Sequence, residues 1–170
     1  MKKKAQLGFT LIELVLYFGL LSIFIVIMSQ MFTAIMDVKL ESASTSSVQQ
    51  DATYLKARLS YDIRRAANIL SPAVGQSASS LSLDIVENGT DKTYTYQLDG
   101  SVLTLSDGTN TDTLVSSESA VTQFLVTRVG NSGTITGARD TVDVQLTVTS
   151  RYQTPRPADQ VQYQFAAGLR

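Results

Sequence analysis

Residues 14–36 form a run of 23 amino acids without a single charge, built largely from leucine, isoleucine, valine, phenylalanine and methionine. A helix needs about 20 apolar residues to cross a bilayer, so this run is long enough to span one. Lys2, Lys3 and Lys4 lie ahead of it, and positive charge favours the cytoplasmic side of a membrane. The sequence therefore predicts a single membrane-spanning helix with its N-terminus inside and the remainder of the chain outside.

Two simpler interpretations of this segment are open. An ordinary secretory signal peptide has an apolar core of about 7–15 residues and then a small-residue cleavage site. The run here is longer, although Ser42-Ala43-Ser44 offers a weak cleavage site. A plain single-span anchor fits the length but does not explain Glu13, because a carboxylate at membrane depth is costly without a partner. Glu13 therefore favours a third interpretation, in which this carboxylate has a dedicated partner.

The residues around Glu13 carry a specific motif. The three lysines lead into Ala-Gln-Leu-Gly8, and Phe9-Thr-Leu-Ile-Glu13 then opens the apolar run. This pattern resembles the class III signal of type IV prepilins and type II secretion pseudopilins. The resemblance implies that residues 1–8 are a leader, that a membrane-embedded prepilin peptidase cleaves between Gly8 and Phe9, and that the new amine of Phe9 is methylated. Glycine suits the cleavage position because the peptidase can approach a backbone without a side chain.

Glu13 is the fifth residue counted from Phe9, and the family carries glutamate at that position. The resemblance implies that its carboxylate pairs with the N-terminal amine of a neighbouring subunit. In surroundings of low dielectric such a pair is strongly attractive, and an unpaired carboxylate is penalised. We therefore expect Glu13 to set the register between subunits of a filament. The alternative is that Glu13 merely lies at the level of the lipid headgroups.

The composition argues against several classes of function. The chain of 170 residues has no cysteine and no histidine, so it lacks disulfides, thiol chemistry and the commonest general base and metal ligand. Its 14 basic and 15 acidic residues become 11 and 15 without the leader, a net charge of −4, and nothing in this balance favours nucleic acid. A serine–lysine pair is the one nucleophilic arrangement left open. We expect no enzyme, no cofactor and no metal site.

The apolar pattern changes beyond the charge-free run but stays helical. Over residues 37–70 apolar side chains recur every three or four positions, which marks one face of an amphipathic helix. These side chains are Val48, Ala52, Leu55, Leu59, Ile63, Ala66 and Leu70. The first proline is Pro72, so the sequence predicts one helix over residues 9–70. Its weakest points are Gly19 and the serine- and threonine-rich residues 42–47.

Beyond Pro72 apolar and polar residues alternate, which is typical of antiparallel strands with one buried face. The predicted strands are 81–86, 93–98, 102–105, 121–129, 142–149 and 160–165. Asp99-Gly100 marks a two-residue hairpin between two of them. We expect an α+β, pilin-like fold, in which residues 71–170 form an antiparallel sheet that packs against the apolar helix stripe.

Two polar loops in this region favour turns. Residues 107–112 carry several oxygen atoms that could bind calcium, but their spacing does not fit an EF-hand. A turn between strands is the favoured interpretation, and calcium binding stays open. Asn88-Gly89-Thr90 formally matches a glycosylation acceptor, yet Asn-Gly is also a tight-turn dipeptide. We expect a turn there as well.

Within the prepilin family the chain most resembles the J-type minor pseudopilins and related minor pilins, through residues 62–66 and the C-terminal residues 164–170. Many major pilins have a helix-interrupting proline at the mature position where this chain has Gln30. We therefore expect a minor subunit at the start or tip of a pilus or pseudopilus. It would be processed after Gly8, held in the cytoplasmic membrane with its head outside, and moved into the filament with other subunits by an assembly platform and its ATPase. A major, repeating pilin and a single-span membrane-anchored receptor or surface protein are the alternatives.

Overall fold

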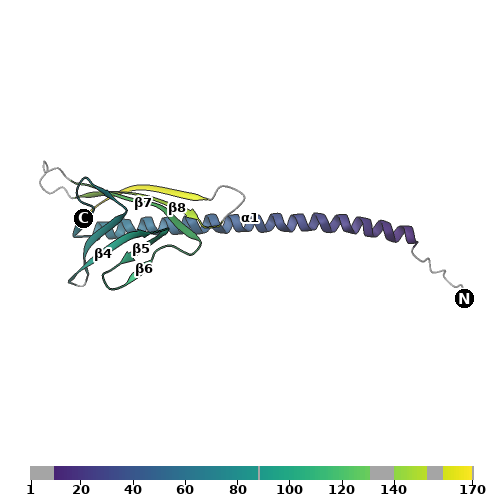
Figure 1. Cartoon of the computed structure of the whole chain (residues 1–170), viewed down its shortest axis with the longest axis horizontal. Helices are drawn as coiled ribbons and strands as arrows, with labels where there is room; N and C mark the ends of the chain where they lie inside the picture. Colours follow the sequence, from purple (N-terminus) through teal and green to yellow (C-terminus); the bar gives the residue numbers. More distant parts are fainter. Residues whose placement is uncertain (1–9, 88, 131–139, 153–158, 170) are drawn as a thin grey trace. The chain divides into compact units, whose positions relative to one another are not determined.

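The computed structural model describes residues 10–87, 89–130, 140–152 and 159–169, and within them lie one helix and nine strands (Figure 1). The chain divides between Glu41 and Ser42 into two compact units, each of which is described by itself below. The elements are α1 (Leu11–Arg65), β1 (Asn68–Ser71), β2 (Ser77–Ala78), β3 (Ser80–Glu87), β4 (Thr90–Asp99), β5 (Val102–Ser106), β6 (Thr111–Thr113), β7 (Ser119–Val129), β8 (Thr141–Ser150) and β9 (Gln160–Gly168). The α+β class predicted from the sequence is confirmed.

The helix ends at Arg65, so the predicted end at Leu70 is wrong. The amide of Ala67 donates to the carbonyl of Asp84 in β3 at 2.7 Å, because the chain leaves the helix there to pair with a strand. In β1 the side chain of Ile69 is 4% exposed, whereas that of Leu70 is 55% exposed. The apolar residue at position 70 thus belongs to a strand, in which successive side chains face opposite sides.

The head contains two antiparallel sheets, whereas the sequence predicted one. The first has the strand order β1-β3-β4-β5-β6, and the second has the order β2-β7-β8-β9. The six strands predicted from alternation are confirmed as β3, β4, β5, β7, β8 and β9. Strands β1, β2 and β6 were not predicted, and they are only two to four residues long. An alternating pattern cannot be recognised over so few residues.

The hairpin between β4 and β5 is confirmed, one residue later than predicted. Asp99 pairs with Val102, which leaves Gly100 and Ser101 as the turn. Gly100 adopts a φ of +60°, and glycine enters this left-handed region without the steric penalty of a side chain. The turn therefore uses the glycine of the Asp-Gly dipeptide as its first central residue.

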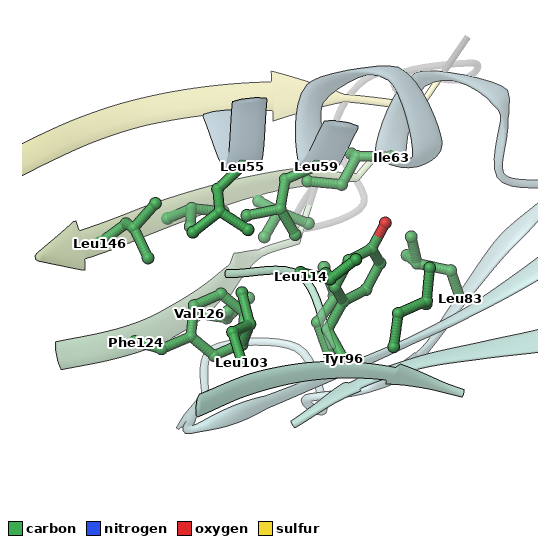
Figure 2. Close-up of a cluster of buried hydrophobic side chains, with 14 of the residues drawn as sticks. Leu55, Leu59, Ile63, Leu83, Tyr96, Leu103, Leu114, Phe124, Val126 and Leu146 are labelled. Carbon is green, nitrogen blue, oxygen red and sulfur yellow. The ribbon is translucent and has the colours of Figure 1, made fainter. Parts of the chain in front are cut away.

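The core of the head lies between the C-terminal part of α1 and the two sheets. Figure 2 shows Leu55, Leu59 and Ile63 pointing from α1 towards the strands. The residues that they face are Tyr96 and Leu103 of the first sheet and Phe124, Val126 and Leu146 of the second (Figure 2). All three helix residues are fully buried, and burying a leucine or isoleucine contributes about 1.5–3 kcal/mol. The predicted packing of the helix stripe on antiparallel sheet is confirmed over residues 48–63.

Candidate membrane span and assembly helix

The N-terminal part of α1 exposes apolar side chains around its whole circumference. The large apolar residues between Leu11 and Leu40 are 43% to 82% exposed. By length and composition α1 is able to cross a membrane. A helix that is apolar on every side is stable in lipid or among other apolar helices rather than in water. A shallow apolar groove on its surface is lined by Leu14, Tyr17, Phe18, Leu20, Leu21 and Phe24.

Thr10 caps the start of the helix. Its side-chain Oγ1 accepts a hydrogen bond from the amide of Glu13 at 3.4 Å, and its carbonyl accepts one from the amide of Leu14 at 3.2 Å. A threonine at this position satisfies amides that have no partner within the helix. Glu13 lies in the first turn, where a negative charge is favoured by the helix dipole.

The other residues of the predicted processing site lie outside the described part of the chain. These are Lys2, Lys3, Lys4, Gly8 and Phe9. The structure therefore places Glu13 on the first turn of α1. The pairing of its carboxylate with the amine of Phe9 in a neighbouring subunit stays a prediction.

The helix continues through both points predicted to be weak, Gly19 and residues 42–47, and through Gln30 as well. At Gly19 an added Cβ would meet no atom of the described residues within 4 Å, so none of them requires glycine there. At Gln30 the carbonyl accepts a hydrogen bond from the Thr33 hydroxyl at 2.9 Å, and the residues around it are helical. The serine- and threonine-rich residues 42–47 are helical too.

Hydroxyl groups hold residues 44–47 against the strands of the head. We call Ser44, Thr45 and Ser47 the hydroxyl clasp. Its hydrogen bonds join Ser44 Oγ to Ser150 Oγ at 2.6 Å, Thr45 Oγ1 to Asp159 Oδ2, and Ser47 Oγ to Ser119 Oγ at 3.3 Å. Ser44 is 2% exposed. These contacts support the helix where its intrinsic propensity is low, which sequence reasoning missed because each partner lies more than 70 residues away.

A buried carboxylate fixes the other end of the helix to the first sheet. Asp62 is 0% exposed, and it accepts hydrogen bonds from Arg58 Nε at 2.9 Å, from Arg65 Nε at 2.8 Å and from the Tyr96 hydroxyl. Burial, together with the hydrogen bond to Asp62, raises the pKa of Tyr96. The phenol therefore stays protonated and donates to the carboxylate. A buried charge needs such partners to be tolerated.

Arg65 extends this cluster to the edge of the head. Its guanidinium lies 5.1 Å from the ring centroid of Tyr61 and 5.2 Å from that of Tyr94. Its Nη1 lies 3.6 Å from Glu87 Oε1, and Glu87 also accepts a hydrogen bond from Lys92 Nζ at 2.8 Å. That hydrogen bond lowers the pKa of the Glu87 carboxyl. The arrangement joins the end of α1 to β3 and β4.

The sequence contained one signal for the buried Asp62 that went unrecognised. Asp62 follows Leu59 by three positions and precedes Ala66 by four. A charged residue at that spacing lies on the apolar face of the helix. Its partner Tyr96 could not be identified in the same way, because it lies 34 residues along the chain in another element.

The first polar loop forms a turn at residues 107–110. Asp107 Oδ1 accepts hydrogen bonds from the amides of Thr109 at 2.9 Å and Asn110 at 2.7 Å, which lowers the pKa of Asp107. Among the described residues no three acidic groups lie close enough together to hold a metal ion. Gly89 has a φ of +79° in the connection between β3 and β4, and Asn88 lies outside the described residues.

Comparison of the chain with family models, with curated proteins and with solved structures gave no match. The resemblance to prepilins therefore rests on the sequence motif.

Proposed function

We propose that this chain is a structural subunit of a type IV pilus or a type II secretion-like pseudopilus. The observation that carries the proposal is the apolar surface that α1 exposes on all sides, with Glu13 as its one charged residue between Leu11 and Met36. Such a surface needs lipid before assembly and apolar helices after it. A filament core built from the same helix of many subunits supplies the second environment.

Glu13 gives this proposal its specificity. A membrane anchor gains nothing from a carboxylate next to a charge-free run, because desolvating the charge is unfavourable. A filament subunit gains a partner for it, since cleavage after Gly8 creates a cationic amine on Phe9. The pair between Glu13 of one subunit and Phe9 of its neighbour would compensate both charges in an apolar core. We propose that this pair sets the axial register.

The proposed pathway follows from the same motif. A prepilin peptidase removes residues 1–8 and methylates Phe9 while the chain is held in the cytoplasmic membrane with its head outside. An assembly platform driven by its ATPase then moves the subunit into the filament. No nucleic acid and no cofactor takes part in this proposal.

We propose a minor role, at initiation or at the tip. Gln30 supports it, because many major pilins have a helix-interrupting proline at that position and α1 is continuous here. The second candidate is a major, repeating pilin, which the exposed apolar helix fits equally well. The third is a single-span receptor or surface protein, which needs the helix but not Glu13.

A Glu13→Gln substitution tests the proposal, because it keeps the size of the side chain and removes its charge. The variant should enter the membrane and be processed normally, with a mature N-terminus at Phe9 by intact mass. Its incorporation into purified filaments should fall roughly tenfold or more, the factor that corresponds to about 1.4 kcal/mol. Asp37→Asn is the matched control, since it removes a carboxylate from the same helix beyond the charge-free run.

Two results would contradict the proposal. One is a mature N-terminus other than Phe9. The other is normal filament incorporation of the Glu13→Gln variant, which would favour the anchored receptor.

A further inference from the structure

Within the described residues, the four edge strands of the head differ in how well they are protected. In the first sheet β1 has four residues and an irregular register, and β6 has three residues. In the second sheet β2 has two residues. The fourth edge, β9, has nine residues in unbroken register with β8 and contains neither a charge nor a proline. Short strands, bulges, charges and prolines are the usual protection of an edge against pairing, and β9 has none of them.

The hydrogen bonds at the two ends of β9 show which backbone groups face outward. Ser150 N donates to Asp159 O at 3.0 Å, and Leu169 N donates to Asp140 O at 3.2 Å. Both bonds involve odd-numbered residues of the C-terminal segment. In an antiparallel ladder the bonded residues alternate with residues whose amide and carbonyl point the other way. The outward-pointing residues of β9 are therefore Gln160, Gln162, Gln164, Ala166 and Gly168.

This set of outward residues is symmetric about Gln164. If a second β9 approached in antiparallel orientation with Gln164 opposite its own copy, Gln160 would lie opposite Gly168 and Gln162 opposite Ala166. Every pair in that register joins two outward-pointing residues. Each such pair exchanges two backbone hydrogen bonds, so the whole strand would be satisfied by a copy of itself.

The side chains on the inner face fit the same register. Val161, Tyr163 and Phe165 pack against the core and are only partly buried. In the symmetric pair Tyr163 would lie opposite Phe165 of the second copy. These are non-hydrogen-bonded positions, where Cα atoms approach to about 4.5 Å and side chains are closest. Aromatic pairs across neighbouring strands stabilise a sheet, so the pair would cover apolar surface that the single head leaves exposed.

We propose that β9 is a docking edge for β9 of a second copy of this chain, paired antiparallel about a two-fold axis at Gln164. The Thr45 hydroxyl donates a hydrogen bond to Asp159, and further along both elements Lys56 Nζ lies 4.9 Å from the ring centroid of Tyr163. Because the later helix residue contacts the later strand residue, β9 runs in the same direction as this part of α1. The antiparallel pair therefore sets two heads in opposite directions. Subunits that share one membrane or one filament also share a direction, so this contact joins chains from two different membranes or filaments. It is therefore separate from filament packing and does not depend on Glu13.

Single-cysteine variants of the full chain in detergent test the proposal, because the natural sequence has no cysteine. Gln164→Cys should form a disulfide-linked dimer under mild oxidation, since paired Cα atoms about 5.5 Å apart suit a disulfide. Gln160→Cys should link to its own copy at least tenfold less, because those residues would be about 27 Å apart along the strand. Gln145→Cys is the matched control on β8, directly beside Gln164 in the register.

A second variant tests the contact without a crosslink. Gln164→Lys places two like charges at the two-fold axis and should abolish the dimer seen by light scattering, while Gln145→Lys should leave it intact. Both variants should keep the circular dichroism of the natural chain. Equal crosslinking at positions 164, 160 and 145, a dimer that survives Gln164→Lys, or open-ended fibres in place of a closed dimer would overturn the proposal. The same measurements on Glu13→Gln should be unchanged, which separates this proposal from the filament role.

Discussion

Removing the hydroxyl of Tyr96 should destabilise the head by a predictable amount. The phenol is 0% exposed and donates to Asp62, which is also 0% exposed. A hydrogen bond to a charged group contributes about 1.5–3 kcal/mol. Tyr96→Phe leaves Asp62 with its two arginine donors, so we expect the lower end, about 1.5 kcal/mol. For a chain of this size that loss lowers Tm by about 3–6 °C.

Thermal unfolding of the full chain in detergent, followed by circular dichroism, measures the change. Tyr54→Phe is the control, because the side chain of Tyr54 on the same helix is 49% exposed, and it should shift the stability by less than about 0.5 kcal/mol. A double-mutant cycle with Asp62→Asn should show that the two substitutions are not additive. Equal effects of Tyr96→Phe and Tyr54→Phe would refute the reasoning, since the buried hydroxyl would then contribute no more than an exposed one.

Two further predictions concern packing and pH. Leu59→Ala should lower the free energy of unfolding by about 2–5 kcal/mol, because it empties a fully buried position. Leu70→Ala should change the free energy of unfolding little, because Leu70 is 55% exposed, and urea unfolding measures both variants. Lys92 lowers the pKa of the Glu87 carboxyl below its ordinary value of 4.5. The ionised carboxylate therefore contributes fully to the stability of the head above pH 4.5, and this contribution is lost as the pH falls through the lowered pKa. The difference in Tm between the natural chain and Glu87→Gln should therefore shrink below about pH 4.5, and a constant difference down to acid pH would contradict this.

Much of the fold could be predicted from the sequence because its signals are local. The charge-free run predicts a long helix, and alternation over 142–149 predicts β8 correctly. The end of the helix could not be predicted in the same way. Ala67 leaves the helical path to bond Asp84, which is a contact between distant positions. The same reason explains why one sheet was expected and two were found, since alternation shows which face of a strand is buried and not which strands are neighbours.

In the candidate site, the sequence singled out Glu13 but gave no sign of the contacts of the hydroxyl clasp. The role of Glu13 is predicted from its spacing to Gly8 and Phe9 and stays a prediction, and the structure adds only the place of Glu13 in the first turn of α1. The hydroxyl clasp was interpreted as a weak stretch, because propensity alone penalises serine and threonine within a helix. Helix propensity does not show that the small hydroxyl side chains of Ser44 and Ser47 form hydrogen bonds with serines in β8 and β7.

The distribution of contacts along α1 has a mechanical consequence. From Ser44 to Ile63 the helix is attached to the head by the hydroxyl clasp at one end, the apolar stripe in the middle and Asp62 near the other end. These attachments extend over about 29 Å of helix. A force applied along the helix axis would load them together in shear, so the head could not be detached one contact at a time.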